Sequence, residues 1–119
     1  MRSFEFARRI VKTCERLWNG PGARHVAQQL MRCGTSVGAN AEEAQDAQTK
    51  ADFVARLSIS RKEARETRYW LRLAVYSGAA TAAEIEWELK EIGEIRAMLV
   101  AAIRTARASA SRGESLPDS

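Results

Sequence analysis

The clearest pattern of apolar and polar positions lies between residues 53 and 75. Small and apolar residues recur there at alternating steps of four and three, the spacing of a helix that packs along one face in a bundle. This seam consists of Phe53, Leu57, Ser60, Ala64, Thr67, Leu71 and Ala74. Thr49 supplies an N-cap hydroxyl, and Gly78 suits the left-handed position that closes a helix. The pattern therefore predicts a helix that starts after Thr49 and stops at Ser77-Gly78, with its seam inside the subunit.

The same spacing predicts three further helices, at about residues 3–18, 23–47 and 81–108. Their inward residues are Phe6, Ile10, Cys14 and Leu17, then Val26, Leu30, Cys33, Val37 and Ala41, then Ile85, Leu89, Ile92, Leu99, Ile103 and Ala106. Asn19-Gly20-Pro21-Gly22 ends the first helix, and Thr81-Ala82-Ala83-Glu84 matches a capping box that opens the last. Four helices joined by short turns predict one domain over residues 1–108, an all-α, up-down-up-down four-helix bundle with antiparallel neighbours. Residues 109–119 are small and polar and are expected to form a disordered tail.

The second predicted helix contains two glycines four residues apart, Gly34 and Gly38. A glycine inside a helix costs roughly 1 kcal/mol relative to alanine. Either another helix approaches closely at this point or the helix is locally irregular. We favour close approach, which would give these glycines a packing role.

Arginines form a second pattern on the helix that follows Thr49. At about 100° per residue, Arg61, Arg65, Arg68 and Arg72 fall within a wedge of roughly 60° that contains no acid. Net charge is +4, with basic excess in residues 1–20 and 49–78. We expect Arg8, Arg9, Lys12 and Arg16 to extend the same surface. Such a localised excess favours an anionic partner such as nucleic acid, and ordinary solvated helix faces are the alternative.

A third sector of that helix lies roughly opposite the arginines and carries Ile59, Trp70 and Leu73. This sector is too apolar for an ordinary solvent face, so we expect a second copy of the chain to cover it in a homo-oligomer. Glu63 and Glu66 lie in the same sector, where covered carboxylates require partners. We expect a polar network, with scattered surface ion pairs as the alternative. Its predicted members are Arg32, Asn40, Glu43, Glu63 and Glu66.

Groups suited to catalysis or metal binding are scarce. His25, the only histidine, has no plausible Ser or Cys partner and is expected at the surface or at a helix cap. Cys14 and Cys33 lack zinc-site spacing and are expected to be buried free thiols rather than a disulfide. We therefore predict no enzyme activity, no metal and no cofactor. The absence of a signal peptide and of a run of ~20 apolar residues predicts a cytoplasmic protein without membrane contact.

Two segments carry a resemblance to a known family. The first, T-S-x-G-A-N-x-x-E, is formed by Thr35, Ser36, Gly38, Ala39, Asn40 and Glu43. The second is F-x-x-x-L-x-I from Phe53, followed by K-E-A-x-E-T-x-Y-W-L from Lys62. Together they resemble the small bacterial four-helix-bundle family of proteins encoded in intervening sequences of large-subunit ribosomal RNA genes, with accessory proteins of diversity-generating retroelements as structural relatives. The resemblance implies homopentamers shaped as a short barrel, no known enzyme activity and, for the retroelement proteins, binding of nucleic acid and of a reverse transcriptase through a basic surface.

Two functions follow from these patterns. The first is a non-catalytic homo-oligomer that binds the RNA or DNA backbone through its arginine-rich helix faces, without reading bases. The second is a protein-interaction scaffold or accessory subunit, for example for a reverse transcriptase, with no direct nucleic-acid binding. A guanidinium group binds phosphate and carboxylate alike, so the sequence leaves both open.

Overall fold

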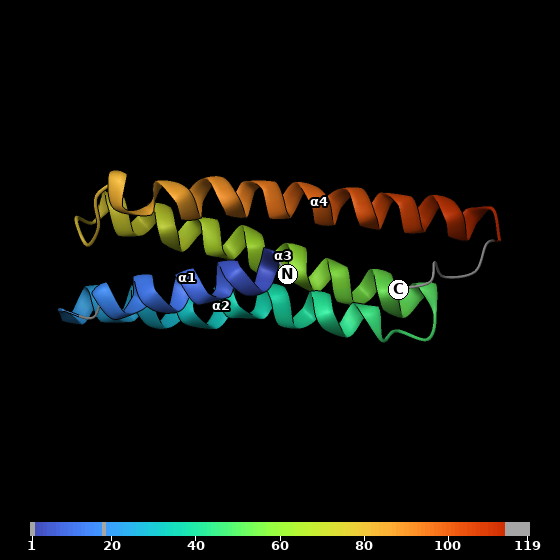
Figure 1. The fold of residues 1–119 in the computed structure, drawn as a ribbon, viewed down its shortest axis with the longest axis horizontal. Coiled ribbons are helices and arrows are strands. Elements are labelled where there is room, and N and C mark those ends of the chain that lie inside the picture. Colours follow the sequence, from blue (N-terminus) through green and yellow to red (C-terminus); the bar gives the residue numbers. More distant parts are fainter. Residues whose placement is uncertain (1, 18, 114–119) are drawn as a thin grey trace.

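The computed structural model describes residues 2–17 and 19–113, and within these ranges the chain is helical, without strands. The helices are α1 (Arg2–Arg16), α2 (Pro21–Gln45), α3 (Lys50–Tyr76), a short 3-10 helix η1 (Ala83–Ile85) and α4 (Glu86–Ser111). The prediction of an all-α fold is therefore confirmed. The α1–α2 and α3–α4 connections lie at one end of a rod about 52 Å long, and the α2–α3 connection lies at the other (Figure 1).

The helix ends follow the local chemistry of the predicted caps. The backbone N–H of Asp52 donates to the Thr49 hydroxyl at 3.1 Å, and Gly78 takes a positive φ after α3, as predicted. Thr81 and Glu84 form the reciprocal bonds of a capping box, at 3.0 and 3.2 Å. This box opens η1, however, and α4 begins only after it, at residue 86.

Other helix boundaries also differ from the prediction, and α1 and α2 each end about two residues early, at Arg16 and Gln45. Helix α2 starts two residues early, at Pro21, because proline is well suited to the first helical position, where no N–H bond is required. Helix α4 continues to Ser111, so residues 109–111 are helical rather than part of a tail. Ser109 is buried and contacts Lys50 at the start of α3, which ties the end of α4 to the bundle. Residues 112 and 113 form a turn, and residues 114–119 of the predicted tail lie outside the described residues.

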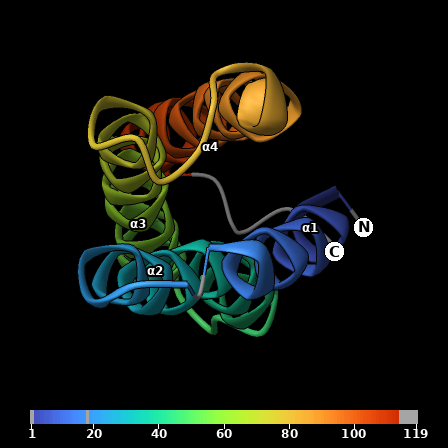
Figure 2. The same ribbon diagram turned by 90° about the vertical axis from the view of Figure 1, so that its left-hand side faces the viewer.

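Helix α3 is central to the packing. It packs against both α2 and α4, whereas α1 packs mainly on α2, and α1 and α3 lie on opposite sides of the bundle (Figure 2). Most of the predicted inward residues are buried, and Phe53, Ala41 and Leu89 are partly covered. Cys14 and Cys33 are buried free thiols, as expected. Burial raises the pKa of the Cys14 thiol to about 12, which keeps it protonated and unreactive.

The close approach predicted at the two glycines is confirmed, and the approaching helix is α1. A Cβ atom added at Gly34 would lie 2.8 Å from Cγ2 of Ile10, and one added at Gly38 would lie 3.2 Å from Oγ of Ser3. The missing side chains therefore allow the backbone of α2 to lie against α1.

Helix α1 is shorter than the other three, with 15 residues against 25 to 27. Beyond its first residue a cavity of about 720 Å³ opens between α2, α3 and α4. Its lining is mainly apolar and includes Val37, Phe53, Leu57 and Leu99. Among the described helices, none is both long enough and apolar enough to span a bilayer.

Candidate nucleic-acid interface

The arginine stripe consists of Arg61, Arg65, Arg68 and Arg72 on α3. Arg61 is partly exposed and the other three are exposed. Within residues 2–17 and 19–113, none of the four forms an ion pair or a side-chain hydrogen bond. Four full positive charges therefore face solvent along about three turns of helix without an acid to neutralise them.

The flank of α3 that carries the stripe follows from its other contacts. Glu63 and Glu66 reach Arg32 on α2, so they mark the side of α3 that faces α2. At about 100° per residue, the arginine stripe lies on the other side of the buried seam, toward α4. The stripe therefore borders the surface shared by α3 and α4.

The predicted extension of the stripe onto α1 is wrong, for two reasons. Helix α1 lies across the bundle from α3 (Figure 2), and each of the four bases predicted to extend the stripe has an acidic neighbour. Arg8 pairs with Glu5 at 2.6 Å, and this hydrogen bond lowers the pKa of the Glu5 carboxyl. Lys12 lies 3.9 Å from Glu15. The positive charges of Arg8 and Lys12 are therefore largely neutralised by acids of the same helix.

The other two of the four bases that were predicted to extend the stripe are Arg9 and Arg16, and each lies 3.8 Å from Glu88 of α4. Glu88 is fully buried, accepts a 2.5 Å hydrogen bond from the Thr13 hydroxyl, and has one oxygen, Oε1, without a hydrogen-bond partner among the described residues. Arg9 also stacks over the Trp87 ring at 4.5 Å. This cluster joins α1 to the start of α4.

The role of Glu88 was not predicted from the sequence, although its spacing carries a signal. Glu88 falls on the same three-and-four spacing as Ile85, Ile92, Ile95 and Leu99, which places it on the buried side of α4. An acid at a core position in this pattern requires basic or hydroxyl partners from a neighbouring helix.

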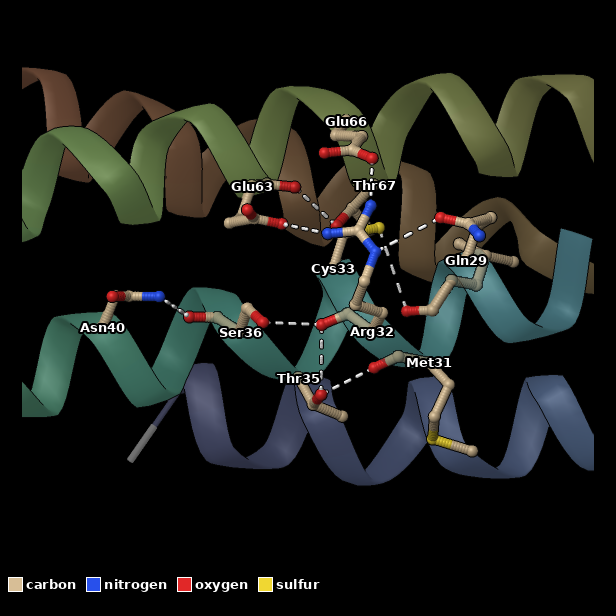
Figure 3. Close-up of polar contacts among 11 residues, drawn as sticks. Gln29, Met31, Arg32, Cys33, Thr35, Ser36, Asn40, Glu63, Glu66 and Thr67 are labelled. Atoms are coloured by element: carbon tan, nitrogen blue, oxygen red, sulfur yellow. Dashed lines mark hydrogen bonds and ion pairs between the residues drawn. The ribbon is translucent and has the colours of Figure 1, made fainter.

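The predicted polar network is present only in part (Figure 3). Arg32 of α2 donates to Glu63 of α3 at 3.3 Å, also bonds Glu66, and donates through Nε to Gln29 at 3.2 Å. Glu63 is mostly buried, whereas Arg32 is about half exposed. The cluster ties the two helices together on the flank opposite the stripe.

Asn40 and Glu43 do not join this cluster. Asn40 donates to the carbonyl of Ser36 on its own helix at 2.9 Å, and Glu43 pairs separately with Arg56 at 2.8 Å. Glu43 is eleven residues beyond Arg32, or about 16 Å along the helix, which is too far for a shared contact. The predicted single network is therefore wrong for these two residues.

The apolar sector of α3 is partly covered by the chain itself. Trp70 and Leu73 pack against the core, and the Trp70 ring lies edge-on to His25 of α2 at 5.6 Å. Ile59 remains 41% exposed, and the buried indole Nε1 of Trp70 has no acceptor in the described part of the chain. The sequence predicted that a second copy would cover this sector, but the chain itself covers part of it, with His25 of α2 against Trp70.

Potential metal ligands are not clustered in the described part of the chain. No group of three or more His, Cys, Asp or Glu side chains that could hold a metal ion occurs among the described residues.

Comparison with known proteins identifies relatives of this arrangement. A family described as 23S rRNA-intervening sequence protein matches residues 1–101. A crystal structure of a protein of unknown function from the S23 ribosomal protein family of Bacteroides thetaiotaomicron superposes with a TM-score of 0.81. The two sequences are 40% identical, and the match covers 86% of this chain and 94% of the other. None of the curated proteins matches the chain.

Proposed function

From the premise that the chain belongs to the family of 23S rRNA-intervening sequence proteins, we propose that it is a non-catalytic, cytoplasmic protein that binds the phosphate backbone of nucleic acid. The binding surface is the arginine stripe of α3. The observation that carries the proposal is the absence, among the described residues, of any acid paired with Arg61, Arg65, Arg68 or Arg72. Bases elsewhere in the bundle, by contrast, are repeatedly paired with acids.

Backbone binding follows from the chemistry of this stripe. Each guanidinium can donate two parallel hydrogen bonds to one phosphate, and each phosphate contact releases condensed counterions. Four contacts on a duplex predict that log affinity falls by about 4 per log unit of salt concentration. Such contacts position the protein on the helix and carry no sequence information.

The test compares two double variants with the same change in net charge. Arg65→Gln with Arg68→Gln removes two charges from the stripe, and Arg8→Gln with Lys12→Gln removes two exposed charges from α1. Anisotropy titrations of labelled RNA at several salt concentrations should show the α3 variant binding more weakly, with a salt slope smaller by about 2. The α1 variant should stay close to the unsubstituted protein. If both variants lost affinity for RNA equally, the effect would be explained by net charge alone, and the assignment of binding to the stripe would be overturned.

We further propose that the chain functions as a homo-oligomer, with the pentamer that the family resemblance implies as the expected form. Ile59 supports this, because its side chain is 41% exposed and a neighbouring copy would cover it. A ring would repeat the arginine stripe and increase avidity for a long polyanion.

Sedimentation of the purified protein tests the assembly. Ile59→Glu should shift the distribution toward monomer, because an acid would be buried in the interface. Tyr76→Glu is the matched control, since Tyr76 is on the same helix, is 85% exposed and lies on a different face. A monomer at micromolar concentration before any substitution would contradict the proposal.

A further inference from the structure

Three arginines of α4 lie on the same side of the bundle as the stripe. Arg96, Arg104 and Arg107 are exposed, and in the described part of the chain they have no ion pair or side-chain hydrogen bond. Two acids in the first half of α4 bind Arg2 of α1, whereas these three arginines have no counter-charge among residues 2–17 and 19–113.

Helix geometry places these arginines beside the stripe. Glu91, Glu94 and Met98 all contact Arg2, so they mark the side of α4 that faces α1. At about 100° per residue, Arg96 and Arg107 lie nearly opposite that side, on the flank toward α3. Arg104 lies next to them on the outer surface. The α3 stripe and these three residues therefore lie on one surface shared by the two helices.

The relative register of the two helices extends the surface along the rod. Lys50 at the start of α3 contacts Ser109 at the end of α4, so the two helices run antiparallel past each other. In that register Arg96 lies level with about residue 63 of α3 and Arg107 with about residue 52. Together with the stripe they occupy about 20 residues of helix, or roughly 30 Å.

We propose that α3 and α4 together form a two-row basic surface that binds double-helical nucleic acid along its phosphate backbone. The inference rests on the proposed function and adds the class of nucleic acid and three binding residues, Arg96, Arg104 and Arg107. Packed helices lie about 8–10 Å apart, so the arginines form two roughly parallel rows. Over roughly 30 Å a duplex offers about 18 phosphates on its two strands, which is ample for seven cations.

The four arginines of the stripe are not interleaved with aromatic rings, which favours a duplex over a single strand. Proteins that bind single strands alternate cations with exposed aromatic rings, on which the bases stack. In the described residues, no aromatic side chain lies within the wedge occupied by the stripe. Tyr69 and Tyr76 are exposed and lie at the edge of this wedge, four residues after Arg65 and Arg72. Tyr69 packs edge-on against Trp70 at 5.1 Å, and Tyr76 is the last residue of α3.

The first experiment asks whether α4 takes part. The double variant Arg96→Gln with Arg107→Gln is compared with the α3 pair and with the α1 control pair, and all three carry the same change in net charge. The affinity of each variant is measured for a labelled RNA duplex of about 20 base pairs, which is longer than the proposed surface. Circular dichroism verifies that each variant is helical. We expect the α4 pair to lower the salt slope by about 2, as the α3 pair does.

The outcomes separate the two proposals. If the α3 pair weakens binding and the α4 pair behaves like the α1 control, the two-row surface is overturned and the α3 stripe stands. If neither pair differs from the control, both proposals fail.

The second experiment asks which nucleic acid binds. The unsubstituted protein is titrated with the RNA duplex, with a DNA duplex of the same sequence and with either RNA strand alone, all at one salt concentration. The proposal predicts tighter binding to both duplexes than to the single strands. Equal or tighter binding to a single strand would overturn the assignment to double helices. A large preference for the RNA duplex over the DNA duplex would support binding to double helices and show that the surface recognises A-form geometry.

Discussion

Replacing Gly34 by alanine tests how closely α1 and α2 pack. The added Cβ would lie 2.8 Å from Cγ2, 3.1 Å from Cγ1 and 3.3 Å from Cβ of Ile10. Because these atoms surround the branch point of a fully buried side chain, rotation of one methyl group cannot relieve all three contacts. Overpacking of this kind typically costs about 1–3 kcal/mol.

Gly93→Ala is the matched control. Gly93 lies inside α4, and an added Cβ there would meet nothing within 4 Å. Alanine is about 1 kcal/mol more favourable than glycine inside a helix, and this gain applies to both substitutions. The difference in unfolding free energy between the two variants therefore isolates the contact with Ile10.

Urea denaturation at one fixed protein concentration measures that difference. Gly93→Ala should be more stable than the unsubstituted protein, and Gly34→Ala should be less stable than Gly93→Ala by about 1–3 kcal/mol. If the two substitutions stabilise equally, α1 does not press on Gly34, and the account of the glycine pair is refuted.

Three further predictions concern buried polar groups. Ser60→Ala should lower stability by about 1 kcal/mol, because the Ser60 hydroxyl donates to the carbonyl of Val37 at 2.6 Å and its loss leaves that oxygen without this bond. Urea denaturation measures the change in stability, and an unchanged midpoint would contradict the prediction. Glu88→Gln should lower the melting temperature by several degrees, because it removes the buried charge that two arginines face; a rise on thermal unfolding would show that desolvation of Glu88 outweighs its ion pairs. Cys14 should resist a thiol reagent at about pH 8 until denaturant is added, because burial raises its pKa to about 12. Since only the unfolded thiol ionises between about pH 9 and 12, stability should fall there by up to about 1.4 kcal/mol per pH unit, and Cys14→Ala should reduce that slope.

The seam of α3 could be predicted from sequence because spacing alone determines which side chains share a helix face. Leu57, Ser60, Ala64, Thr67 and Leu71 are all buried, and the N-cap at the start of the helix forms as predicted. The same arithmetic placed the four arginines on one flank. These features depend on one helix only, so they need no knowledge of its neighbours.

Features that depend on two helices were harder to predict. Arg8, Arg9, Lys12 and Arg16 of α1 were expected to extend the stripe because helical periodicity does not say which helices lie diagonally across a bundle. The cover over Trp70 was assigned to another copy because nothing local shows that His25 of α2 lies against it. For Glu88 the spacing indicated a buried position, but its partners on α1 follow only from the packing of α1 against α4.

Protection of individual arginines from chemical modification tests the proposed binding surface most directly. The protein is treated with an arginine-selective reagent such as phenylglyoxal, with and without saturating RNA duplex, and modified residues are identified by mass spectrometry. The account predicts that RNA protects Arg61, Arg65, Arg68 and Arg72, while the modification of Arg8 on the far side of the bundle is unchanged. Equal modification of the stripe in the presence and absence of bound RNA, or protection of Arg8 in its place, would contradict the account.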